Sequence, residues 1–142
     1  MREVKRSALV GKPPAQLFTL INDIESYPQF LPWCIHARVQ SRSPQQIVAT
    51  LGVRRGALHG EFTTRNTLEP DRRIAMHLVS GPFRLLQGEW RLTPIEANGC
   101  RVDLAMKFAF RNPLTAVLFE RSFAATIGSL VEAFVARARQ LS

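Results

Sequence analysis

The stretch GCRVDLAMKFAFRNPL, residues 99–114, contains the transition that decides the fold. From residue 100 to residue 110 every second side chain is apolar, and charged residues or alanines fall between them. This alternation predicts a β-strand over residues 99–111 with one buried face. Asn112 and Pro113 then predict a helix start, because Asn is a favoured N-cap and Pro is tolerated at the first helical position.

The predicted C-terminal helix is long and has one apolar stripe. We find no strong stop signal before Gln140, which gives a helix of about 40 Å at 1.5 Å per residue. Gly128 in its middle either permits a close approach or a bend, or is a neutral small residue. The stripe predicts a helix that covers one face of a sheet, and it consists of Phe119, Phe123, Ile127, Leu130, Val131 and Phe134.

Upstream of this helix the apolar pattern has a period of two. It predicts six successive strands, over residues 34–42, 45–55, 58–69, 72–80, 84–95 and 99–111. The turns between them are short, which favours an antiparallel meander. Residues 2–11 predict an earlier strand. After this first strand, Pro13 and Pro14 open a helix that ends at residues 22–23. Residues 26–29 then fit the S-x-x-Q capping box of a second, very short helix.

These elements predict an α+β fold in which a curved, seven-stranded antiparallel sheet surrounds a long C-terminal helix, with two short helices after the first strand. The length suits a single domain over residues 1–142. A sheet of this size curves because its strands twist. A curved sheet around a straight helix predicts either an elongated apolar cavity or a core filled by large side chains, and the pattern alone does not separate these two interpretations.

The stretch YPQFLPWC, residues 27–34, concentrates three aromatic residues and two prolines. Tyr27 and Phe30 are three residues apart and therefore share one side of the short helix, with Leu31 beside them. Pro32 ends that helix, so Trp33 lies at the junction with the next strand. These side chains either line the mouth of a cavity or pack as part of the core.

The net charge of +8, from 19 Lys and Arg against 11 Asp and Glu, predicts attraction to phosphates, whether of RNA or of anionic lipid headgroups. A solubilising surface explains the same charge equally well. Residues 8–10 are too short an apolar run for a signal peptide, and no run approaches about 20 apolar residues. We therefore expect a cytoplasmic protein, in which Cys34 and Cys100 are reduced, buried thiols.

Catalytic chemistry requires a positioned acid–base pair, and the sequence does not predict one. His36, His59 and His77 are isolated, and the last two fall on the outward parity of their strands. The sequence shows neither a Ser-His-Asp nor a Cys-His arrangement, and no spacing typical of metal ligands. We therefore predict a protein without catalytic residues or a bound metal, and not an enzyme.

Four motifs, NDIESYPQFLPWC, FTTRNTLEP, LVSGPFRLLQGEWRLTPI and NGCRVDLAMKFAFRNPL, resemble those of the coenzyme Q-binding START-domain family. That family includes the bacterial RatA-type ribosome-association toxins, and the resemblance extends from about Val4 to Ala136. It implies the helix-grip fold that polyketide cyclases and the major birch-pollen allergen share. It also implies a binding protein or chaperone for ubiquinone that supports respiratory electron transport. For the toxin branch it implies binding to the large ribosomal subunit and inhibition of subunit joining.

We therefore expect the chain to bind ubiquinone or a similar polyprenyl quinone in an apolar cavity, without a catalytic cofactor. Contact with an anionic membrane, peripherally at the inner membrane, is part of this expectation. The alternative is a ribosome-binding, toxin-like protein whose basic residues contact RNA. The predicted ligand contacts are the residues of the aromatic corner and of the apolar inner face, namely Tyr27, Phe30, Leu31, Trp33, Phe62, Met76, Trp90, Phe108, Phe123, Ile127 and Phe134.

Overall fold

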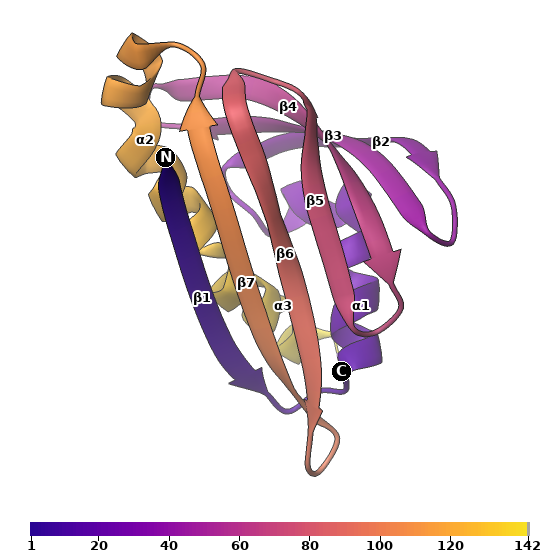
Figure 1. Cartoon of the computed structure of the whole chain (residues 1–142). Helices are drawn as coiled ribbons and strands as arrows, with labels where there is room; N and C mark the ends of the chain where they lie inside the picture. Colours follow the sequence, from indigo (N-terminus) through magenta and orange to yellow (C-terminus); the bar gives the residue numbers. More distant parts are fainter. Residues whose placement is uncertain (142) are drawn as a thin grey trace.

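One antiparallel sheet contains all seven strands, in the order β1-β7-β6-β5-β4-β3-β2. The computed structural model describes residues 1–141, so Ser142, which the predicted domain includes, lies outside the described residues. The sheet curves around the C-terminal helices (Figure 1). The elements are β1 (Arg2–Val10), α1 (Pro14–Asn22), the 3₁₀ helix η1 (Ile24–Gln29), β2 (Cys34–Arg42), β3 (Gln46–Arg55), β4 (Leu58–Glu69), β5 (Arg73–Ser80), β6 (Phe83–Ile95), β7 (Gly99–Phe110), α2 (Pro113–Gly128) and α3 (Leu130–Gln140).

The predicted fold class is confirmed, and each strand boundary lies within one residue of its predicted position. The alternation in β7 has the expected cause, since Val102, Leu104 and Phe108 are buried on the concave face while Arg101 and Lys107 are exposed on the other. The first strand pairs with the last, with Val4 opposite Met106. The first and last strands of the chain are therefore neighbours, and β1 and β2 form the two edges of the sheet.

The start of α2 follows the predicted capping chemistry. The Asn112 side-chain oxygen Oδ1 accepts hydrogen bonds from the backbone N–H groups of Leu114, at 2.8 Å, and Thr115, at 3.4 Å. These are two of the N–H groups that have no partner inside the helix. Pro113 occupies the first turn, as expected.

The predicted long C-terminal helix is present, but a turn at Ser129 divides it into α2 and α3, where the sequence predicted no interruption. The hydroxyl of Ser129 donates a hydrogen bond to the Thr126 carbonyl at 2.7 Å. At Gly128 the Arg6 side chain of β1 approaches so closely that an added Cβ would lie 3.0 Å from its Nη2. Gly128 therefore permits a close approach between the helix and the first strand.

The predicted capping box at residues 26–29 is wrong. The short helix η1 begins at Ile24, so Ser26 lies inside it and not at its start. The Ser26 hydroxyl donates instead to Asp23 Oδ2 at 2.6 Å. The helix is of the 3₁₀ type, which suits a six-residue segment with Pro28 inside it.

The segment Pro113–Gln140 is long and apolar enough to cross a membrane by length and composition, since an 18-residue window within it has a mean hydropathy of 1.3. This corrects the expectation that no segment approaches a membrane span. In the structure Phe123, Ile127 and Phe134 of this segment are buried against the sheet. The segment is thus the core helix pair of this fold.

Candidate functional site

The candidate site is the space between the concave face of the sheet and the helices α2 and α3. One group of rings, which we call the corner cluster, consists of Tyr27, Phe30, Trp90 and Phe134. The Phe134 ring centroid lies 5.2 Å from those of Tyr27 and Phe30 and 5.3 Å from that of Trp90, each in an edge-to-face arrangement. Such pairs add to the stability that burial supplies. Rings from η1, β6 and α3 are thereby in direct contact.

A second group of rings, the sheet cluster, lies under α2 and consists of Phe62, Phe83, Phe108, Phe110 and Phe123. Phe123 supplies the helix side of this cluster, with its ring centroid 4.9 Å from that of Phe108 and 5.0 Å from that of Phe83. Phe62, from β4, lies 6.1 Å from Phe123 and is only half-buried. The rings of the sheet and the helix therefore touch across the interior.

The structure places all eleven predicted contact residues in the apolar core or packed against it. Eight of them are buried, whereas Phe30, Phe62 and Met76 are half-buried. Large side chains occupy much of the space that the sheet encloses, as the second of the two interpretations of the sequence expects. A ligand in this interior would displace rings from one another.

A hollow of ≈ 450 Å³ opens beside the corner cluster, and we call it the mouth. Arg54 and Arg55, at the end of β3, border it, and the Arg54 backbone N–H donates to the Trp33 carbonyl at 2.8 Å. Arg55 Nη1 donates to the buried Thr126 hydroxyl of α2 at 3.4 Å. The mouth lies at the turn between α2 and α3, and its lining consists of Leu31, Pro32, Trp33, Arg54, Arg55, Ser129 and Ala133.

A wider groove of ≈ 1000 Å³ runs along α1, opposite the β2–β3 turn. Its apolar residues include Phe18, Ile47 and Leu68. Asn22 lies at its edge and donates through Nδ2 to the Phe18 carbonyl at 3.0 Å. Its buried Oδ1 has no hydrogen-bond partner within residues 1–141.

Two polar residues of β4 on the concave face were not among the predicted contacts. Asn66 lies opposite Ile47 and Met76 in the sheet and is buried. Thr64 donates a hydrogen bond to Asn66 Oδ1 at 2.9 Å. The signal for both was available, because they share the parity of Phe62.

Burial raises the pKa values of two titratable side chains at or near the corner cluster. It raises the pKa of the Tyr27 phenol well above 10.0, with smaller contributions from Cys34 and Asp23, and the phenol donates to the Ile21 carbonyl. Burial also raises the pKa of the Cys34 thiol from 9.0 to about 11. Cys34 and Cys100 are both free and buried, as predicted. Neither Tyr27 nor Cys34 is therefore activated for acid–base or nucleophilic chemistry at neutral pH.

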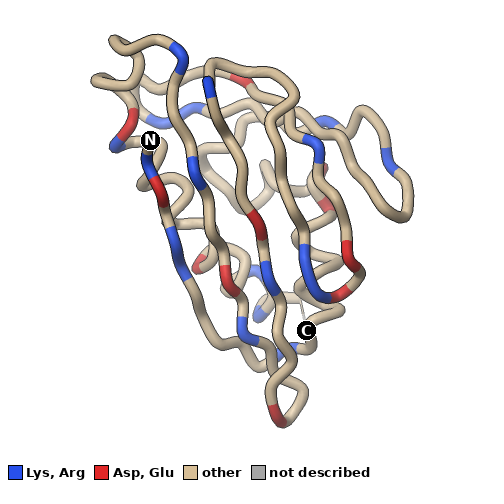
Figure 2. The backbone as a smooth tube through the Cα atoms, in the orientation of Figure 1, with Lys and Arg blue, Asp and Glu red and all other residues tan. Residues whose placement is uncertain are grey.

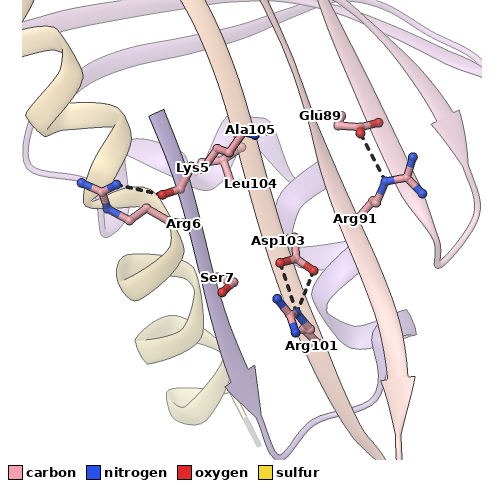
Figure 3. Close-up of a pocket in the computed structure, with 9 residues that line it drawn as sticks. All are labelled: Lys5, Arg6, Ser7, Glu89, Arg91, Arg101, Asp103, Leu104 and Ala105. Carbon is pink, nitrogen blue, oxygen red and sulfur yellow. Dashed lines mark hydrogen bonds and ion pairs between the residues drawn. The ribbon is translucent and has the colours of Figure 1, made fainter. Parts of the chain in front are cut away.

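The convex face of the sheet carries the charged side chains. Figure 3 shows a shallow hollow on β1, β7 and β6 in which Arg101 contacts Asp103 at 3.1 Å and Arg91 contacts Glu89 at 3.2 Å. Arg73 also pairs with Glu89, and this hydrogen bond lowers the pKa of the Glu89 carboxyl. Each of these acids is therefore matched by an arginine.

The histidines lie away from the interior. His59 and His77 are exposed on the convex face, as their parity predicts. His36 Nε2 lies 3.2 Å from Glu61 Oε2 on the same face. The His36 ring lies over Gly52, in space that a side chain at that position would occupy. Within residues 1–141, no group of three His, Cys, Asp or Glu side chains could hold a metal ion.

A curved antiparallel sheet closed over a C-terminal helix pair, with an aromatic interior and a mouth at one end, defines the helix-grip class of hydrophobic-ligand-binding folds. Residues 10–135 match the family described as polyketide cyclase / dehydrase and lipid transport, and the chain belongs to that family.

Among its relatives, the ribosome association toxin RatA of Escherichia coli K12 is 38% identical over 99% of this chain and 89% of its own length. The protein of the same name from Vibrio cholerae strain O395 is 39% identical over 99% of this chain and 98% of its own.

Solved structures agree with the fold. A protein of 18 kDa from Caulobacter crescentus is 30% identical, with a TM-score of 0.78, and covers 99% of this chain and 98% of its own. A START superfamily protein from Mycobacterium smegmatis has a TM-score of 0.82 at 18% identity, over 99% of both chains. The ZhuI aromatase/cyclase of a Streptomyces species has a TM-score of 0.79 at 20% identity, over 98% of this chain and 94% of its own. The fold is thus shared with a START superfamily protein and an aromatase/cyclase.

Proposed function

We propose that this protein binds an apolar, lipid-like molecule between the sheet and the helices α2 and α3, and that the molecule is ubiquinone or a similar polyprenyl quinone. The observation that carries the proposal is the continuity of the mouth with the apolar core, since Leu31 and Trp33 line the mouth and belong to the buried core. A polyprenyl tail needs an apolar channel, and a quinone head needs one or two hydrogen-bond donors. The family's description as lipid transport supports this class of ligand.

The polar groups near the interior suit a quinone head. At the mouth, Arg55 lies close enough to bond the Thr126 hydroxyl, so its remaining N–H groups offer donors to a carbonyl oxygen. Deeper on β4, Asn66 supplies a side-chain amide on the concave face. In this arrangement the tail separates the rings of the corner and sheet clusters, and the head stays near Arg55.

The proposal describes a binding protein and not a catalyst. Its support is the position of the titratable side chains, since His59, His77 and Glu89 lie on the convex face. Tyr27 and Cys34, which reach the interior, are held protonated at neutral pH by burial. We propose a cytoplasmic carrier that supports respiration from the surface of the inner membrane.

The test is extraction of the protein, purified from a respiring host, with organic solvent, followed by absorbance and mass measurement of any quinone. The matched variants lie on α2: Ile127→Trp fills the interior, whereas Leu118→Trp adds the same ring at an exposed position. We expect quinone with the wild type and with Leu118→Trp, and at least about a tenfold reduction with folded Ile127→Trp. Absence of quinone from the wild type, together with no uptake of added quinone, would disprove the proposal.

A second candidate, association with the ribosome, has its own observation. Arg38, Arg54 and Arg65 on the convex side of β2, β3 and β4, together with Arg55, form no ion pair within the described part of the chain. Figure 2 shows basic residues along these strands. Relatives named ribosome association toxins favour contact of such a surface with RNA phosphates.

Sedimentation with ribosomes at low and moderate salt tests this second function. We expect Arg38→Gln/Arg65→Gln to weaken co-sedimentation, whereas the control Arg91→Gln, which alters an arginine already paired with Glu89, leaves it unchanged. Lack of co-sedimentation of the wild type, with no loss of joined ribosomes on overexpression, would exclude it.

A further inference from the structure

Exposed apolar side chains gather at the start of α2. Leu114, Val117 and Leu118 are 66%, 82% and 60% exposed, respectively. Because they are three and four residues apart, they project from one side of the helix. In the most apolar 18-residue window of the helical segment, only 28% of the residues are buried. Core packing therefore accounts for Phe123 and Ile127 but not for the three exposed residues at the start of α2.

Two further exposed apolar side chains lie at the same end of the molecule. Val79 is next to the β5–β6 turn, which is fixed to the start of α2 because the Arg111 backbone N–H donates to the Pro82 carbonyl at 3.0 Å. Met1 precedes Arg2, whose guanidinium lies 3.9 Å from Glu120 of α2. Figure 1 shows the N-terminus, the start of α2 and the β5–β6 turn together at one end. We call this group the end patch, and it consists of Met1, Val79, Leu114, Val117 and Leu118.

The fold does not need these side chains to be apolar. The packed stripe of α2 is formed by later residues, among which Phe123 and Ile127 are buried. The helix start is held by Asn112, whose cap does not depend on the exposed side chains. Leu114, Val117 and Leu118 form an exposed apolar face on one side of the helix, and such a face marks an interaction surface more often than singly scattered apolar residues do.

The charges around the end patch are mainly positive. Arg84, Arg111 and Arg121 are exposed and near it, and the one acid of α2, Glu120, has Arg2 as its partner. In Figure 2 blue segments border this end of the tube. Apolar side chains surrounded by arginines fit a surface with an apolar interior and an anionic boundary.

We propose that the end patch inserts into the surface of an anionic phospholipid bilayer. The patch projects into solvent, since its three α2 side chains are more than half exposed. A protruding group suits a fluid interface better than a rigid protein partner, which would need a complementary shape. The inference rests on the proposed function, since a quinone carrier must reach the bilayer where quinones reside.

The test is co-sedimentation of the purified protein with phosphatidylglycerol/phosphatidylcholine vesicles and with phosphatidylcholine vesicles. We expect binding to the anionic vesicles, and at least about a tenfold lower partition coefficient for Val117→Gln/Leu118→Gln. The matched control is Leu9→Gln/Ile95→Gln, which removes two exposed apolar side chains at the opposite end of the sheet and should bind like the wild type. Arg111→Gln/Arg121→Gln should weaken binding and reduce its dependence on salt.

Several outcomes would overturn the inference. The first is failure of the wild type to bind anionic vesicles, and the second is an equal loss of vesicle binding in the two apolar double variants. The third is a wild-type dimer that Val117→Gln/Leu118→Gln makes monomeric while vesicle binding is unchanged. The last result would assign the patch to a second copy of the chain. Vesicle binding is measured without quinone and quinone extraction without vesicles, so failure of this inference is distinguishable from failure of the proposed function.

Discussion

The two parts of the C-terminal helical segment use apolar residues in opposite ways. In the second part of α2 and in α3, Phe123, Ile127 and Phe134 are buried against the sheet. In the first turns of α2, Leu118 and Val117 have similar hydropathy and are exposed. The difference does not come from residue type but from the side of the helix, since Ala116 and Phe119 of the same turns pack against the core whereas Val117 and Leu118 are exposed. Apolar residues on the packed side stabilise the fold, and those on the exposed side are available for a partner.

The strongest test of this comparison is Phe134→Ala. Phe134 touches three other rings and is fully buried, so its removal should lower the free energy of unfolding by about 3–5 kcal/mol. The matched change Leu118→Ala should stay within about 0.5 kcal/mol of the wild type. Guanidinium unfolding measures both. Similar losses in the two variants would show that the early turns of α2 also belong to the core.

Trp33→Ala tests whether Trp33, which lines the mouth, also contributes to the packing of the core. Trp33 is buried but borders the hollow, so we expect a loss of about 3 kcal/mol, at the lower end of the range for a large aromatic residue. Trp33→Phe keeps most of the ring and should recover more than half of that stability. A loss below about 1 kcal/mol for Trp33→Ala would instead identify Trp33 as a gate that packing does not require.

The pH dependence of the free energy of unfolding tests whether the Cys34 thiol is buried. The folded pKa of Cys34 is raised from 9.0 to about 11, so its contribution to stability is complete below pH 9 and is lost as the pH rises through 11. By pH 10.5 the loss should be about 2 kcal/mol. Cys34→Ala should lack this part of the slope, and the difference between the two urea-unfolding profiles isolates it. Parallel profiles would mean that the thiol is accessible to water.

The smallest effect is expected at the start of α2. Asn112→Ala removes the cap of two backbone N–H groups and should cost about 1 kcal/mol, whereas Asn112→Asp keeps an acceptor and should cost less. Thermal unfolding with both variants checks this. A loss as large as that of Phe134→Ala would contradict the view that this end is weakly coupled to the core.

Much of the fold was predictable because its signals are local. The alternation of β7 and the Asn112-Pro113 start placed the last strand and α2 correctly, and parity placed His59 and His77 on the convex face. The turn at Ser129 was not predicted, and the packing of Arg6 of β1 against the preceding Gly128 has no local signal because the two residues are distant in sequence.

The candidate site was predicted in part for the same reason. The parity that selected Phe62 also identifies Asn66, which was missed because polar residues were not considered on the apolar face. The contact of Arg55 with Thr126 joins β3 to α2 and has no local signal. The predicted ligand contacts remain a prediction, since burial alone does not distinguish a lining residue from a packed one.

The pairing of the first strand with the last also affects how the chain can fold during synthesis. Arg2 lies opposite Phe108, so β1 has no partner strand until β7 has left the ribosome. The meander from β2 to β6 is built from neighbouring strands and can form earlier. Contacts of such large sequence separation slow folding, because the loop between the partners must close before the contact forms. The N-terminal strand, made first, is therefore among the last elements to be secured, together with the helix pair that covers the sheet.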